Sequence, residues 1–253
     1  MTVFEEFWTL HGQWASQTPI IKETIELTSS KLYLSDVPGE FFNFAVPKTE
    51  SPGNLDLAEI GKNGIYLFEK YWHCGFLEHL TKNGYKFLGT DCWLVSGRDA
   101  NLEMQISTNI LEVSRETFPD FYKVMSVVFK NFSGNKKYLE VCRDSLTNKT
   151  LGGDLQSKFF LIYEGGKPVS GAGVFFSQAN NIAYFHNAGT LENFRGKGYQ
   201  TSLIKHRLKL VRDLGINRIY AITELGSSSW KNYLKLGFDQ AQVAVIMAPN
   251  KKP

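Results

Sequence analysis

The sequence of 253 residues has little of what marks secreted, disulfide-stabilised or membrane-spanning chains. Its three cysteines, Cys74, Cys92 and Cys142, are odd in number and widely spaced, which argues against a disulfide framework. No apolar run approaches the ~20 residues that a membrane-spanning helix needs. The first ten residues carry no basic cluster ahead of an apolar stretch, so we expect no secretory signal and a cytoplasmic protein.

A metal site is also not predicted. His73, Cys74 and His79 lie close together in the sequence. Their offsets do not fit the C-x-x-C or H-x-x-x-H pairs typical of zinc sites. A buried thiol and two partly exposed imidazoles on one helix account for these residues without a metal ion.

The charge is unevenly spread along the chain. Residues 1–100 hold 8 Lys and Arg against 13 Asp and Glu, whereas residues 101–253 hold 20 against 12. Such an asymmetry indicates two units with different partners. A polar, turn-like segment at residues 96–101 marks the expected boundary, so we predict domains at 1–100 and 101–253.

The hydrophobic pattern predicts a mixed α/β (α+β) fold, in which helices pack on a mixed sheet. Helices are expected over residues 65–81, 118–129, 137–146, 198–214 and 228–236. Strands are expected over residues 87–95, 102–107, 159–163, 169–176, 182–188, 218–223 and 241–248. The glycine-containing turn between 159–163 and 169–176 is typical of a β-hairpin.

A glycine-rich segment follows the strand expected at 182–188 and opens the next helix. It reads Arg195, Gly196, Lys197, Gly198, Tyr199, Gln200, Thr201. Glycines let the backbone approach a ligand closely, and the free N–H groups of a first helical turn bind phosphate well. Taken alone, this segment is equally well explained as a basic surface turn.

A second motif, Tyr233-Leu234-Lys235-Leu236-Gly237-Phe238, ends the last expected helix and leads into a strand. Together the two motifs resemble the GCN5-related N-acetyltransferase (GNAT) superfamily. Arg195 and Gly198 match the family's Arg/Gln-x-x-Gly-x-Gly/Ala motif, whose last small residue is Gln200 here. Tyr233, Gly237 and Phe238 match its Tyr-x-x-x-Gly-Phe motif. The resemblance implies an acyl-CoA N-acyltransferase fold over residues 101–253.

The resemblance also implies how acetyl-CoA would be held as a co-substrate. The backbone amides of Arg195, Gly196, Lys197, Gly198, Tyr199, Gln200 and Thr201 would bind the pyrophosphate. The strand end at Ala188, Gly189 and Thr190 would pair with the pantetheine arm. The helix that begins near Ser228 would border the thioester. Gln200 is bulkier than the family's residue, and it either crowds the pyrophosphate or points away.

Acyl transfer to an amine needs a neutral amine and a proton for the departing thiolate. Tyr233 is the candidate acid, because a phenol held against the sulfur can donate a proton. The base is less well defined. Some family members carry a glutamate at the position of Ile182, so His186, on the same strand face, and Glu224 are the candidates, with deprotonation through water as a third route.

Residues 1–100 resemble a partial, degenerate copy of the same fold. Leu80-Thr81-Lys82-Asn83-Gly84-Tyr85 repeats the pattern of helix end, capping glycine, aromatic residue and strand seen around Tyr233. Leu80 stands where the second copy has Tyr233, and Phe41-Phe42-Asn43-Phe44 stands where a glycine-rich turn would be. We expect this half to bind no CoA and to wall one side of the acceptor site.

Three functions are therefore open. The first is N-acetylation of a primary amine on a small molecule or peptide. The second is acyl-CoA binding or protein interaction without catalysis, for which Gln200 is the sign. The third is aminoacyl-tRNA-dependent transfer, since such enzymes also use paired GNAT-like lobes. Nucleic-acid binding is not predicted, because the basic helix has no stacking aromatics beyond Tyr199, and no membrane partner is expected.

Overall fold

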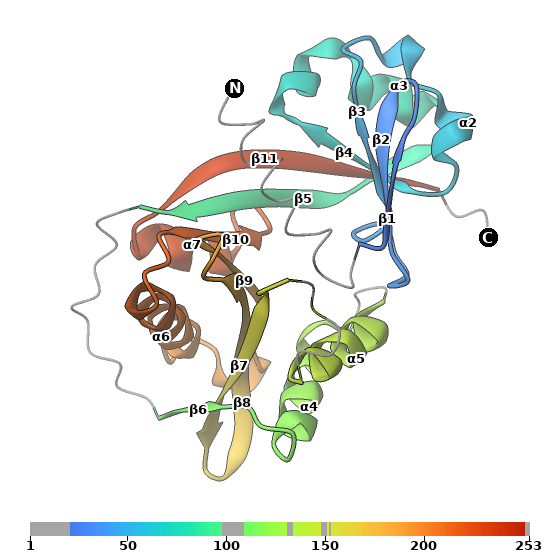
Figure 1. The fold of residues 1–253 in the computed structure, drawn as a ribbon. Helices are drawn as coiled ribbons and strands as arrows, with labels where there is room; N and C mark the ends of the chain where they lie inside the picture. The colour runs from blue at the N-terminus through green and yellow to red at the C-terminus, as the bar shows by residue number, and fades with distance from the viewer. Residues whose placement is uncertain (1–20, 98–108, 131–133, 148–150, 152, 251–253) are drawn as a thin grey trace. The chain divides into compact units, whose positions relative to one another are not determined.

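The computed structural model describes residues 21–97, 109–130, 134–147, 151 and 153–250, and it has the mixed α/β class that the sequence predicts (Figure 1). The chain forms two compact units. One contains Met1–Cys92 and Ala241–Pro253, and the other contains Trp93–Gln240. The predicted domain boundary between residues 100 and 101 remains a prediction.

In the first unit the strands lie in the order β1-β2-β3-β4-β11-β5. Its strands are β1 (Glu23–Glu26), β2 (Ser30–Leu34), β3 (Phe44–Pro47), β4 (Gly64–Phe68), most of β5 (Tyr85–Ser96) and most of β11 (Phe238–Pro249). Its helices are η1 (Pro52–Asn54), α2 (Leu57–Ile60), η2 (Glu69–Cys74) and α3 (Phe76–Lys82). The β3–β4 pair is parallel, whereas the β1–β2, β2–β3 and β4–β11 pairs are antiparallel.

The helix predicted over residues 65–81 is wrong in its first part. Gly64–Phe68 is strand β4, the 3-10 helix η2 follows, and the α-helix begins only at Phe76. All five residues of β4 are buried, and the strand lies between β3 and β11 in the sheet. A strand buried on both faces has no polar alternation, so periodicity does not separate it from a buried helix.

The second unit agrees closely with the sequence-based expectations. Its strands are β6 (Ile110–Glu112), β7 (Gln156–Glu164), β8 (Lys167–Ser177), β9 (Ile182–Thr190) and β10 (Arg218–Thr223), in the order β10-β9-β8-β7-β6. Its helices are α4 (Phe118–Val128), α5 (Asn135–Ser145), η3 (Glu192–Phe194), α6 (Tyr199–Asp213) and α7 (Ser228–Lys235). The strand predicted over residues 102–107 lies outside the described residues.

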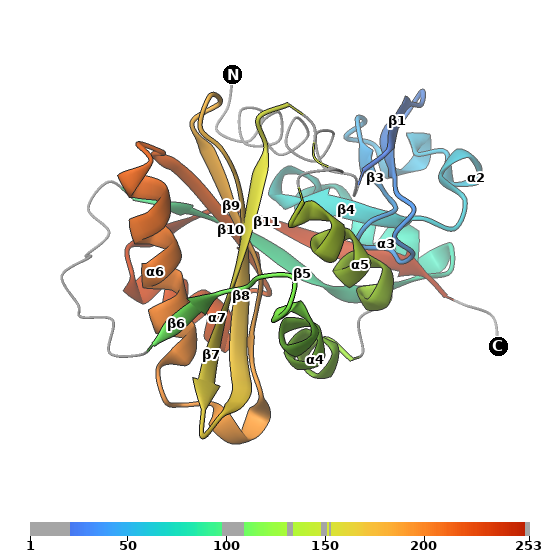
Figure 2. The same ribbon diagram turned by 60° about the horizontal axis from the view of Figure 1, so that its bottom comes forward.

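Helices cover both faces of the second unit's sheet. Helices α4 and α5 lie on one face and α6 on the other, and both α4 and α6 contact β8 and β9 (Figures 1 and 2). Two glycines allow α4 to approach closely. A Cβ at Gly189 would lie 2.4 Å from the Val128 side chain, and one at Gly171 would lie 3.1 Å from Phe121. Larger residues there would push α4 off the strands that carry the candidate site.

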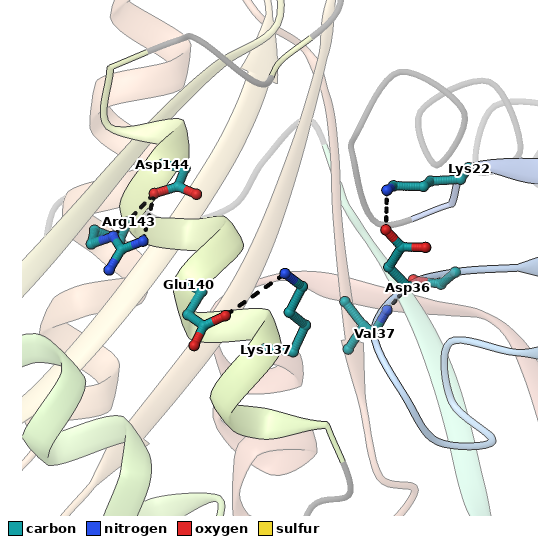
Figure 3. A network of polar contacts seen from close by, with 8 residues as sticks. Lys22, Asp36, Val37, Lys137, Glu140, Arg143 and Asp144 are labelled. Atoms are coloured by element: carbon teal, nitrogen blue, oxygen red, sulfur yellow. Dashed lines mark hydrogen bonds and ion pairs between the residues drawn. The ribbon is translucent and has the colours of Figure 1, made fainter.

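The surface of α5 carries two ion pairs, Lys137–Glu140 at 3.7 Å and Arg143–Asp144 at 3.0 Å (Figure 3). Figure 3 also shows the Lys22–Asp36 pair of the first unit. Exposed pairs of this kind contribute little to stability. In the part of the chain that the structure describes, no helix has the length and apolar character needed to cross a membrane.

Candidate functional site

Strands β9 and β10 part from each other at their C-terminal ends. Their parallel pairing runs from Arg218↔Ile182 to Ala221↔Phe185, and no pair beyond it joins the described residues of the two strands. Both strands continue past that point, to Thr190 and Thr223. The β9 backbone after Phe185 therefore has an edge without a strand partner on the β10 side, which can accept an added extended chain.

A β-bulge lies on this open part of β9. Gly189 pairs with Gly171 and His186 pairs with Gly173, so Asn187 and Ala188 together oppose a single residue of β8. Asn187 has a φ of 46°, in the left-handed region that asparagine tolerates better than most residues. Its Nδ2 lies 3.3 Å from the Cys142 Sγ. The bulge re-aims the backbone beside the predicted pantetheine-binding residues Ala188, Gly189 and Thr190.

The predicted phosphate loop connects η3 to α6. Gly196 and Gly198 both have left-handed backbones, with φ of 78° and 79°. A Cβ at either glycine would meet nothing within 4 Å, so backbone conformation rather than crowding requires glycine. Helix α6 begins at Tyr199 without a side-chain cap, which leaves its first-turn N–H groups free of intrahelical partners. Such a loop at a helix start is suited to bind an anion.

A carboxylate from the β7–β8 hairpin contacts this loop. Glu164 Oε1 lies 2.6 Å from the Lys197 Nζ, and the Tyr199 hydroxyl donates to Glu164 Oε2. These contacts hold the pKa of Glu164 below its usual value, and the hydrogen bond to Glu164 raises the pKa of Lys197. Lys197 is therefore paired with a carboxylate. The sequence did not reveal this pair, because Glu164 lies far from the loop along the chain.

The Gln200 side chain is directed toward α7. Its Nε2 donates to the Ser229 hydroxyl at 2.8 Å, and its Oε1 accepts from the Asn232 Nδ2 at 2.8 Å. The residue that departs from the family motif thus links the first turn of α6 to α7. Ser228, predicted to border the thioester, is the first residue of α7, whose N-cap is Ser227.

Tyr233 lies on α7 and is 2% exposed. Its ring packs edge-on against Phe238, with centroids 4.8 Å apart. The Tyr233 hydroxyl lies 3.3 Å from the Arg207 Nη2 of α6. The proposed acid is therefore held by packing along its ring and by a guanidinium at its hydroxyl.

His186 is enclosed on the α4–α5 side of the sheet. Its Nδ1 lies 2.9 Å from the Tyr138 hydroxyl, and its ring stacks on Phe175 at 4.1 Å. Its Nε2 is buried without a hydrogen-bond partner among the described residues. Burial, with the nearby Arg207 charge, places the pKa of His186 well below its usual value, so the imidazole is neutral at pH 7. By contrast, Glu224 follows β10 and is exposed.

Residues 120–238 match the model of the acetyltransferase (GNAT) family. No curated protein matches this chain in sequence. A conserved protein of unknown function from Staphylococcus epidermidis is similar in structure at TM-score 0.71 and 15% identity, over 92% of this chain and 95% of the other. A GCN5-related N-acetyltransferase from Kribbella flavida is similar at TM-score 0.67 and 15% identity, over 98% of this chain and 95% of the other. A tandem GNAT protein from the clavulanic acid biosynthesis pathway is similar at TM-score 0.58 and 11% identity, over 88% of this chain and 79% of the other.

Proposed function

We propose that the protein is an acetyl-CoA-dependent N-acetyltransferase, because residues 120–238 match the model of the acetyltransferase (GNAT) family. Its acceptor is a primary amine on a small molecule or a peptide. The observation that carries the proposal is the combination of three features in one unit. These are the glycine loop at the start of α6, the open edge of β9, and Tyr233 on the helix after β10.

The residues present suit acetyl-CoA. The uncapped start of α6 and the left-handed Gly196 and Gly198 provide N–H groups for the pyrophosphate. The unpaired edge of β9 at Ala188–Thr190 provides main-chain groups for the amides of the pantetheine arm. The Gln200 side chain is hydrogen-bonded to Ser229 and Asn232 of α7, which supports the expectation that it points away from the pyrophosphate.

The chemistry is direct attack of a neutral amine on the thioester carbonyl. The C–N bond forms, the C–S bond breaks, and the electron pair of that bond leaves with the sulfur. Tyr233 supplies the proton that turns the thiolate into a thiol. The amine proton passes to a base, for which His186 is neutral but enclosed and Glu224 is exposed; water remains the third route.

A thiol-release assay with acetyl-CoA tests this function. The panel of acceptors contains polyamines, aminoglycosides, amino acids and peptides with free N-termini. Calorimetry with CoA runs in parallel. We expect thiol release that depends on one class of amine. CoA binding without turnover on any amine would favour the second candidate, a non-catalytic acyl-CoA-binding protein.

The aminoacyl-tRNA-dependent alternative is less well supported. The two left-handed glycines of the loop Arg195–Thr201 serve a pyrophosphate, which acetyl-CoA has and the aminoacyl end of a tRNA lacks. We propose that residues 1–100 are the degenerate GNAT-like lobe and shape the acceptor side. Their excess of acidic residues favours a cationic acceptor.

A further inference from the structure

Arg207 of α6 is a buried cation that the proposed mechanism has not used. Its side chain is 0% exposed. Its Nε donates to the Leu203 carbonyl at 3.1 Å and its Nη1 to the Gly173 carbonyl at 2.8 Å. Its guanidinium lies 4.4 Å from the centre of the Phe185 ring. Among the described residues, no carboxylate pairs with it.

Keeping a charge in this position is costly. A buried cation without an acidic partner loses its hydration and regains only the hydrogen bonds and the ring contact. Burial accordingly lowers the pKa of Arg207, and the Tyr233 oxygen acts in the opposite direction. A methionine would fill a similar space in a helix core without this cost. An arginine that only packs would therefore be a poor choice for the site.

The direction of the Arg207–Tyr233 hydrogen bond follows from the chemistry of the two groups. A guanidinium has five N–H donors and no acceptor. The Tyr233 oxygen must therefore accept from the Arg207 Nη2, at 3.3 Å. The phenolic hydrogen is directed elsewhere, and no other hydrogen bond joins the Tyr233 hydroxyl to a described residue. The phenol is thus held as a proton donor whose hydrogen is still available.

Arg207 also connects Tyr233 to β8, the strand paired with the open strand β9. Gly173, whose carbonyl accepts from Nη1, pairs with His186 at the edge of the β8–β9 register shift. One planar guanidinium therefore bonds the backbone beside the bulge and the phenol on α7. Its rigid fork fixes the Tyr233 oxygen relative to the strands that the thioester would contact.

We propose that Arg207 is a positioning residue that orients Tyr233 for proton donation; this rests on the proposed function. When the C–S bond breaks, the phenol O–H proton moves to the sulfur and the phenol becomes a phenolate. The guanidinium beside it stabilises that negative charge. The proton lost by the amine later restores the phenol through solvent, so no proton is gained or lost overall.

A double-mutant cycle on kcat tests the proposal. The variants are Arg207→Met, Tyr233→Phe and the pair. If Arg207 acts through the phenol, Arg207→Met lowers kcat by roughly 10- to 100-fold, the worth of a charged hydrogen bond. The same change has no further effect once Tyr233 is Phe. The Kd of acetyl-CoA stays within a few-fold. Penalties that multiply in the pair would overturn the proposal.

Two further variants separate positioning from folding. Val211→Ala truncates another buried residue of α6, so its effect on kcat should multiply with that of Tyr233→Phe. Arg207→Lys keeps the charge and a donor, so its kcat should lie between those of the parent and of Arg207→Met. If Arg207→Met does not fold, Arg207→Lys still tests the proposal against the parent. Arg207→Lys at the parental kcat with an altered Kd would overturn the proposal. No turnover of any amine by the parent would reject the proposed function as well, whereas parental turnover with multiplying penalties rejects Arg207 alone.

Discussion

The Glu164 carboxylate at the end of β7 lies 2.6 Å from the Lys197 Nζ in the loop that precedes α6. Any phosphate that Lys197 binds must compete with this carboxylate. The Glu164 contact to Tyr199 adds a second point of attachment on the same loop. The hairpin therefore affects both the charge and the conformation of the proposed pyrophosphate site.

Glu164→Gln should tighten CoA binding. The substitution removes the competing negative charge but keeps a group that can accept from Tyr199. We expect the Kd for CoA to fall by about two- to fivefold at low salt, as the worth of an exposed ion pair allows, with the gain shrinking as salt rises. Calorimetry at two ionic strengths measures this. A weaker affinity would mean that Glu164 chiefly orders the loop.

Gly198→Asp should abolish CoA binding. The change places a Cβ on a left-handed backbone and a negative charge where the phosphates should lie. Gly215→Asp is the matched control, because Gly215 follows the other end of α6 with the same φ of 79° and equally open surroundings. Both variants should lose similar stability, and only Gly198→Asp should lose CoA. Equal affinities would place the CoA site elsewhere.

Gln200→Ala should weaken the fold more than it weakens CoA binding. It removes two partly buried hydrogen bonds, to Ser229 and Asn232, which together are worth about 1–2 kcal/mol. Chemical denaturation should report that loss, and the Kd for CoA should stay within a few-fold. Asn232→Ala should add less in the Gln200→Ala background than alone. A large loss of CoA affinity would show that Gln200 itself contacts the ligand.

His186 should make the fold less stable in mild acid. The folded pKa lies below the unfolded value of about 6.5, so between the two the unfolded chain binds one more proton. Between the two pKa values the free energy of unfolding should fall by about 1.4 kcal/mol for each pH unit. His186→Phe keeps a ring against Phe175 and should flatten this slope, whatever its stability at pH 7. An unchanged slope would assign the acid sensitivity to other groups.

Tyr233→Phe should lower kcat by about 10²- to 10⁴-fold, the usual contribution of a general acid. The ring stays packed on Phe238, so thermal stability and the acetyl-CoA Kd should change little. Steady-state kinetics and a melting curve on the same preparation check both points. A variant that is stable and retains near-parental kcat would make Tyr233 a packing residue.

The sequence predicted local features well. Gly198 precedes α6 and Gly237 follows α7, as expected. Both have a left-handed backbone, for which glycine is the residue that a sequence shows. The spacing of Tyr233 from Arg195 was enough to indicate the fold. Ile65 was misplaced in a helix, because a strand buried on both faces has no distinctive pattern. The partners of the site residues could not be predicted: Arg207 had the appearance of one more basic residue on a solvated helix, and only the tertiary structure places it in the core.

Strand β11 has a consequence for biosynthesis. Its Ala244 pairs with Phe68 of β4, so the first unit lacks a strand until the residues of the second unit, up to Gln240, and then β11 have been synthesised. Pairings so distant along a chain form slowly, and the open edge of β4 would be exposed on the ribosome meanwhile. Nascent chains halted before Ala241 should therefore be protease-sensitive in residues 21–92, and chaperones that bind unpaired strands should act there first.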